Sequence, residues 1–120
     1  MELVALMSSG KGSWGQVAGL VSRGQWEKIF IVCPLYAVSR VKSFDFAQRS
    51  EIISVDFDLP IKEVIEDLKK KLNGKFSGME VALSIASGEG KEHMALISAL
   101  INLPIGIKFV VLTRDGILEV

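Results

Sequence analysis

Short, almost wholly apolar runs that alternate with helical patterns constrain the fold of this chain most strongly. The runs lie at 2–7, 28–33, 51–57, 80–86 and 107–113. A run that is apolar throughout is typical of a strand buried on both faces, as in a parallel sheet. The segments between the runs contain helical patterns and turn residues. The sequence therefore predicts an α/β fold in which helices cover both faces of a mostly parallel sheet.

Handedness predicts the order of the strands. Crossovers between parallel strands are right-handed, which favours a Rossmann-like, doubly wound sheet in the order 3-2-1-4-5. Asp115-Gly116 is a two-residue hairpin signal, so 117–120 is expected to pair back as a short edge strand. With 120 residues, 49% of them apolar, we expect a single Rossmann-like domain over 1–120.

The helical segments differ in how clearly they are marked. Apolar spacing predicts a helix over 14–21, with Ser13 and Gln16 as a capping box and Gly24 as a left-handed C-terminus. The clearest amphipathic stripe runs from 61 to 72. The segment 94–101 is apolar nearly all round, which indicates burial against the sheet and against a partner subunit. The periodicity of 35–47 is too poor to assign.

Composition excludes several classes of protein. Fourteen basic and fourteen acidic residues give a net charge of zero, which argues against an extended nucleic-acid surface. Cys33 is the only cysteine and His93 the only histidine, so neither an intrachain disulfide nor a metal cluster is expected. No apolar run is long enough to span a membrane, and residues 1–7 lack a signal sequence, so we expect a cytoplasmic protein.

Two glycine turns follow the first and fourth runs. In a sheet of order 3-2-1-4-5 these strands are neighbours, and the winding reverses between them. Ligands bind at such a switch point, beyond the carboxyl ends of the strands. The candidate ligand-binding residues are Ser8, Ser9, Gly10, Lys11, Gly12, Ser13 and Trp14 in the first turn and Ser87, Gly88, Glu89, Gly90 and Lys91 in the second.

Two nucleotide motifs match these turns only in part. Gly10-x-Gly12-x-x-Gly15 has the dinucleotide spacing, but the second strand ends in Val32-Cys33-Pro34, without the acidic residue that binds a ribose. Gly90-Lys91 is no triphosphate loop, because Ile85 and Glu92 stand where that motif needs Gly and Ser or Thr. A tight strand-to-helix turn without a ligand is the alternative reading of the segment from Gly10 to Gly15.

Single side chains in these turns also allow two readings. Lys91 opposes the dipole of its helix, so it either faces a bound anion or is simply exposed. His93 is either a general base or a structural residue. Trp14 either packs in the core or stacks on a base. Glu89 repels a phosphate but can accept a hydrogen bond from a ribose.

The turn Ser87-Gly88-Glu89-Gly90-Lys91-Glu92-His93-Met94 resembles the Thr-Gly-Gly-Thr-Lys-x-Met turn of the CARF domains, the CRISPR-associated Rossmann-fold sensors of cyclic oligoadenylates. Asp56-Phe57-Asp58 and the serine turn after the first strand are similar to that family as well. The resemblance implies a nucleotide-binding domain of antiviral defence. It also implies a homodimer whose two crevices form one pocket, with Ser8 or Ser9, Lys11, Gly88, Gly90 and Lys91 as ligand contacts.

Two other functions remain open. Some CARF-type domains cleave their ligand without a metal, by attack of a ribose 2′-OH on the neighbouring phosphate. The resemblance would then give Lys91 the task of stabilising the developing charge. The remaining alternative is a ligand-free assembly module that associates through its apolar last helix.

Overall fold

A computed structural model describes residues 1–10 and 12–120, and it confirms the predicted α/β fold. The strands are β1 (Glu2–Leu6), β2 (Ile29–Pro34), β3 (Ser50–Val55), β4 (Glu80–Ser84), β5 (Gly106–Thr113) and β6 (Gly116–Glu119). They form one sheet in the order β3-β2-β1-β4-β5-β6. All neighbours are parallel except the β5–β6 hairpin, which is antiparallel. The predicted strand order and edge strand are therefore correct.

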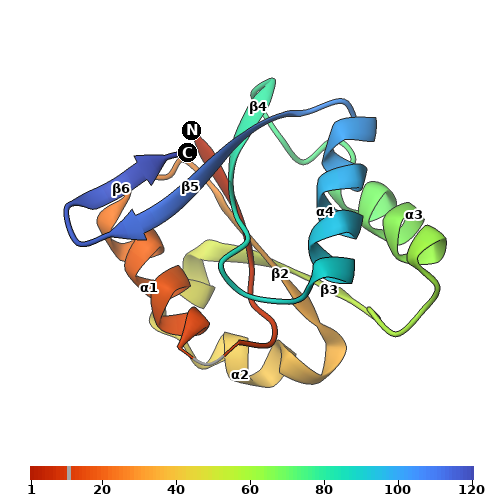
Figure 1. Ribbon diagram of the computed structural model, residues 1–120, viewed down its shortest axis with the longest axis horizontal. Helices are drawn as coiled ribbons and strands as arrows, with labels where there is room; N and C mark the ends of the chain where they lie inside the picture. The colour runs from red at the N-terminus through yellow and green to blue at the C-terminus, as the bar shows by residue number, and fades with distance from the viewer. Residues whose placement is uncertain (11) are drawn as a thin grey trace.

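The helices cover the sheet on both faces (Figure 1). They are α1 (Ser13–Arg23), α2 (Val38–Lys42), α3 (Ile61–Leu72) and α4 (Gly90–Asn102), with 3₁₀ turns η1 (Leu35–Ala37) and η2 (Asp45–Arg49). α3 and α4 lie together on one face, and α1 and α2 on the other. No helix among residues 1–10 and 12–120 is long and apolar enough to cross a membrane.

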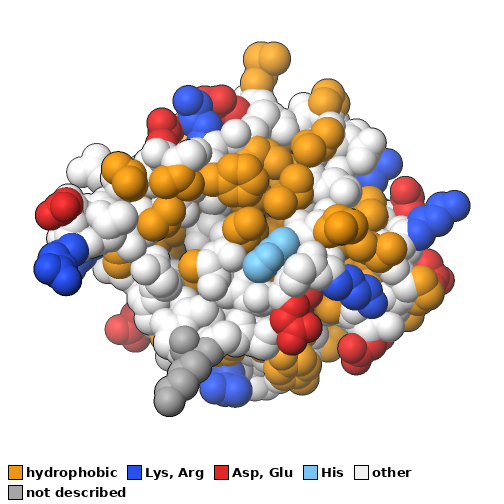
Figure 2. Space-filling model, viewed as in Figure 1, with side chains coloured by type: hydrophobic (Ala, Val, Ile, Leu, Met, Phe, Trp, Pro, Cys, Tyr) orange, Lys and Arg blue, Asp and Glu red, His pale blue; other side chains and the backbone are white. Residues whose placement is uncertain are grey.

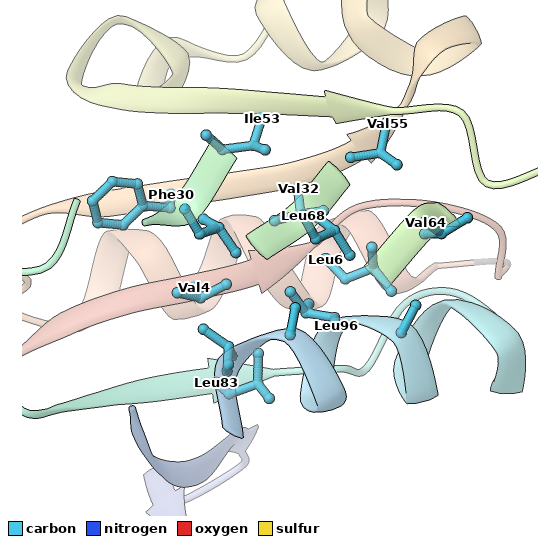
Figure 3. Close-up of a cluster of buried hydrophobic side chains, with 14 of the residues drawn as sticks. Val4, Leu6, Phe30, Val32, Ile53, Val55, Val64, Leu68, Leu83 and Leu96 are labelled. Atoms are coloured by element: carbon cyan, nitrogen blue, oxygen red, sulfur yellow. The ribbon is translucent and has the colours of Figure 1, made fainter. Parts of the chain in front are cut away.

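Strands β1 to β5 divide their side chains between two cores. Val4 and Leu6 of β1 point towards α3 and α4, where they meet Leu68 and Leu96 (Figure 3). Leu3 and its alternate neighbours point to the opposite core, against α1 and α2. This two-sided burial explains why β1, β2 and β4 read as continuous apolar runs rather than as alternating ones.

Both predicted ends of α1 are wrong in detail. Gly12 occupies the N-cap with φ 77°, and Ser13 is already helical, so Ser13 and Gln16 form no capping box. The Gln16 amide instead donates to the carbonyl oxygen of Leu112 in β5 (3.0 Å), a tertiary contact that competes with the local cap. Gly24 ends the helix in an extended conformation (φ −86°), so a left-handed residue is not needed there.

The segment that periodicity could not assign is held by aromatic packing. Phe44 lies between Trp14 of α1 (ring centroids 5.8 Å apart) and Phe46 (5.2 Å). These contacts join residues far apart in sequence, so short helical turns form there without an amphipathic stripe of their own.

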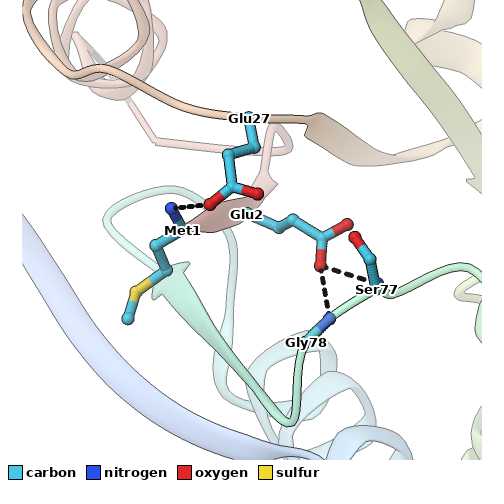
Figure 4. Close-up of polar contacts among 5 residues, drawn as sticks. All are labelled: Met1, Glu2, Glu27, Ser77 and Gly78. Carbon is cyan, nitrogen blue, oxygen red and sulfur yellow. Dashed lines mark hydrogen bonds and ion pairs between the residues drawn. The ribbon is translucent and has the colours of Figure 1, made fainter.

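The amino end of β1 is anchored by two carboxylates (Figure 4). The N-terminal ammonium group lies 2.7 Å from Glu27 Oε1. Glu2 is buried, and its Oε1 accepts hydrogen bonds from the N–H groups of Ser77 (2.9 Å) and Gly78 (3.3 Å). The loop before β4 is thereby tied to β1, at the end of the sheet opposite to the switch point.

Candidate functional site

The two glycine turns meet at the switch point, as the strand order predicts. The Gly88 N–H donates to the carbonyl oxygen of Ser9 (2.6 Å), and the Ser8 N–H donates to Ser87 Oγ (2.8 Å). These hydrogen bonds join residues about eighty positions apart, because β1 and β4 are adjacent. The turns after β1 and β4 therefore form one continuous structure.

Ser87 is the centre of this junction and is fully buried. Its Oγ lies 2.9 Å from Ser13 Oγ and 3.2 Å from the carbonyl oxygen of Ser9. Ser13 Oγ also donates to the carbonyl oxygen of Gly10 (2.7 Å). Of the predicted serine contacts, Ser13 and Ser87 are thus occupied in holding the two turns together.

The N-terminus of α4 is satisfied by its own carboxylates. Glu89 and Glu92 form a capping box, in which the Glu89 N–H donates to Glu92 Oε1 (2.8 Å). The other oxygen of Glu92 accepts a hydrogen bond from Ser8 Oγ (2.6 Å), and Glu92 is only 8% exposed. A carboxylate therefore already occupies the place where an anion would meet the positive end of this helix.

The N-terminus of α1 has the opposite character. No side chain in the part of the chain that the structure describes caps it, and its first turn contains no acidic residue. The backbone at Gly12 is open, since a Cβ there would meet nothing within 4 Å. The Ser13 N–H donates to the Gly10 carbonyl oxygen (3.1 Å). The helix dipole and the remaining N–H groups of the first turn favour an anion at such a place.

A cation lies beside this helix end. The Arg40 guanidinium of α2 stacks 5.0 Å from the ring centroid of Trp14. The two side chains border a hollow of about 460 Å³, whose other lining residues are Gly10, Gly12, Ser43 and Phe44. Trp14 itself is half-buried, and its Nε1 donates to the carbonyl oxygen of Ser8 (2.6 Å), so it packs as one of the two readings expected and also borders the hollow.

A second hollow lies on the other side of the first turn and is acidic. It measures about 410 Å³ and opens at the carboxyl ends of β1, β2 and β3. Its lining residues are Ser8, Ser9, Pro34, Leu35, Tyr36, Val55, Asp56, Phe57, Asp58, Glu89 and Glu92. Among the described residues, four carboxylates and no Lys or Arg line it, so this hollow repels phosphate and suits hydroxyl groups, which donate to carboxylates.

Lys91 lies outside both hollows. It is exposed, and its Nζ donates to the carbonyl oxygen of Leu59 in the loop before α3 (2.7 Å). His93 lies 2.8 Å, through Nε2, from the carbonyl oxygen of Ser87 and so supports the turn. The predicted Lys11 lies outside the described residues.

Metal and thiol chemistry find no support at the site. Within residues 1–10 and 12–120, no three His, Cys, Asp or Glu side chains are placed to hold a metal ion. Burial raises the pKa of the Cys33 thiol to about 11, far above the range in which a thiol is a reactive thiolate.

Sequence reasoning missed Arg40, Glu92 and the carboxylates of Asp56 and Asp58 as parts of the site. The aspartates had a usable signal, because they follow β3 and so lie at the same edge of the sheet as the glycine turns. Arg40 had none, since its short helix lacks periodicity.

Comparison of the sequence with models of protein families gives no match, and no curated protein matches it at a significant level.

Proposed function

We propose that this protein binds a phosphate-rich nucleotide, of the kind of a cyclic oligoadenylate, at the β1–β4 switch point. The observation that carries the proposal is the open N-terminus of α1, which has neither a side-chain cap nor an acidic first turn among the described residues. Arg40 supplies a positive charge beside it, 5.0 Å from the Trp14 ring. A helix N-terminus next to a guanidinium group is a favourable environment for a phosphate.

Such a ligand extends over both hollows, with a phosphate in one and a ribose in the other. A phosphate fits the hollow at Gly10, Gly12 and Arg40, where the charge is positive. The ribose hydroxyls fit the neighbouring hollow, where Asp56 and Glu89 can accept their hydrogen bonds. Both volumes lie within the range of about 300–1,000 Å³ that is usual for ligand pockets. In this arrangement the acidic residues that oppose a phosphate become contacts for the sugar.

The proposal changes which glycine turn receives the phosphate. The similarity to CARF domains points to the second turn, with Lys91 as its cation. In the second turn, however, Glu92 accepts the Glu89 N–H, and Lys91 Nζ donates to the Leu59 carbonyl oxygen. In the first turn the Ser13 N–H donates to the Gly10 carbonyl oxygen (3.1 Å), but no carboxylate among the described residues caps this helix end, so we assign the phosphate to it.

Isothermal titration calorimetry tests the proposal with cyclic tetra-adenylate, ATP and unphosphorylated adenosine. We expect the two phosphorylated compounds to bind and adenosine to bind far more weakly. Arg40→Gln should reduce their affinity by about 10-fold or more, because a charged hydrogen bond contributes about 1.5–3 kcal/mol. Lys42→Gln is the matched control, since Lys42 lies on the same short helix, is exposed and does not line the hollow.

Two results would contradict the proposal. Absence of heat with every phosphorylated compound would exclude a nucleotide site of useful affinity. If Lys91→Gln weakened binding and Arg40→Gln did not, the phosphate would lie at the second turn instead. Chromatography of the ligand after incubation also reports whether it is cleaved.

A further inference from the structure

We infer that the partly exposed face of the β5–β6 hairpin and the adjoining side of α4 form a two-fold interface with a second copy of this chain. Residues 91–102 and 105–120 carry the inference, and it does not depend on the proposed nucleotide site. Figure 2 shows hydrophobic side chains gathered over β5 and α4.

The two faces of the β5–β6 hairpin differ in how much of their apolar surface the rest of the chain covers. On one face, Leu112 and Ile117 pack in the core beneath α1, and Gln16 of α1 is hydrogen-bonded to the backbone of β5. On the opposite face, Leu118 lies opposite Val111 in the hairpin register and is 52% exposed. Val120, which is hydrogen-bonded to the backbone of Phe109, is 73% exposed. On this second face Ile107 and Phe109 pack partly against the core beneath α4, whereas Leu118 and Val120 remain exposed.

α4 extends the same apolar surface. Met94, Ile97 and Ile101 are spaced at i, i+3 and i+7, so they lie along one side of the helix. Met94 is 60% and Ile101 58% exposed, although the neighbouring stripe of Ala95, Leu96 and Leu100 is fully buried. A surface helix that presents apolar side chains on the face away from its own core has an unsatisfied packing surface.

The charge pattern favours an identical partner. The residues of the hairpin on this face are uncharged: Ile107 and Phe109, which also pack against the core, and Val111, Thr113, Leu118 and Val120. The ion pair between Lys108 and Glu119 joins residues that alternate with these and belong to the other face. A two-fold axis brings each residue type close to its own copy, so a surface without charge can pair with itself without repulsion.

The available area agrees with a weak dimer. A buried aliphatic side chain removes roughly 100 Å² from water. The four exposed apolar residues and their half-buried neighbours thus offer about 350 Å² per copy. Since about 60% of a typical interface is apolar, this area corresponds to a total interface of about 1,200 Å². That is the lower limit for a specific complex, so we expect a weak dimer.

Sedimentation equilibrium of the ligand-free chain, from about 5 to about 500 μM, tests the inference. The wild type should pass from monomer to dimer, with little effect of added salt because the interface is apolar. Leu118→Lys and Ile101→Lys each place two like charges in the interface and should raise the dissociation constant at least 10-fold. Both side chains are more than half exposed, so the fold should tolerate the substitutions.

Leu35→Lys is the matched control, because Leu35 is 56% exposed but lies at the carboxyl end of β2. It should leave the dimer unchanged. A wild type that stays monomeric at the highest concentration would overturn the inference, and the face would then serve another partner. A dimer that survives Leu118→Lys, a dimer lost in Leu35→Lys, or open-ended growth beyond a dimer would each overturn it as well.

Discussion

Replacement of Gly88 by alanine tests the junction of the two glycine turns most directly. Gly88 has φ +95°, a conformation that non-glycine residues rarely adopt. A Cβ at this position would lie 2.5 Å from Leu6 Cδ2 and 2.8 Å from Glu92 Oε1. Leu6 is fully buried and Glu92 is bound to Ser8 and Glu89, so neither can move freely.

The expected loss has two parts. The left-handed backbone costs an alanine about 1–2 kcal/mol. Overpacking against Leu6 and Glu92 adds about 1–3 kcal/mol. The sum of about 2–5 kcal/mol is a large share of the 5–15 kcal/mol that stabilises a typical domain. With an unfolding entropy of about 2.1 cal/mol/K per residue, the chain should lose about 4 °C in Tm per kcal/mol, or roughly 8–20 °C in total.

Alanine substitutions at two other glycines separate the backbone cost from the overpacking cost. Gly12 also has a positive φ (+77°), but a Cβ there would meet nothing within 4 Å, so Gly12→Ala should cost only the backbone term. Gly90 has neither a positive φ nor a close neighbour, so Gly90→Ala should cost nothing measurable. Urea denaturation followed by circular dichroism gives the free energies, provided that the m-value stays constant. If Gly88→Ala lost no more than Gly12→Ala, the close packing of the two turns would be refuted.

Two further predictions concern buried polar groups. Ser87→Ala leaves the Ser8 N–H without its partner and should destabilise the fold by about 1–3 kcal/mol, whereas Ser22→Ala, at an exposed serine, should have little effect in the same urea titration. Cys33 should resist alkylation at pH 8 in the native protein and react once urea unfolds it; rapid labelling of the folded chain would contradict its burial. Because burial raises the Cys33 pKa from 9.0 to about 11, its contribution to stability is complete below pH 9 and is lost as the pH rises to about 11. Cys33→Val should therefore be less sensitive to pH than the wild type across this interval, and parallel curves for the two proteins would argue against the shift.

The architecture could be read from the sequence because it depends on local patterns. Continuous apolar runs identify buried parallel strands, and the handedness of crossovers then limits their order. Asp115-Gly116 indicates the hairpin by its turn chemistry, although the turn lies one residue earlier than predicted, at Arg114 and Asp115, and Gly116 begins β6. Together these features predicted that Ser9 and Gly88 would meet, although the two residues are 79 positions apart.

The character of the site was decided only by tertiary contacts. Ser8 and Glu92 are separated by 84 positions, and their hydrogen bond belongs to a carboxylate that occupies the N-terminus of α4. Arg40 reaches the first turn because aromatic packing holds a segment without periodicity beside α1. Local spacing reports which side of a helix or strand is apolar, but not which distant side chain completes a helix end. The sequence alone therefore located the crevice, whereas the folded structure distinguished its self-capped helix end from its open one.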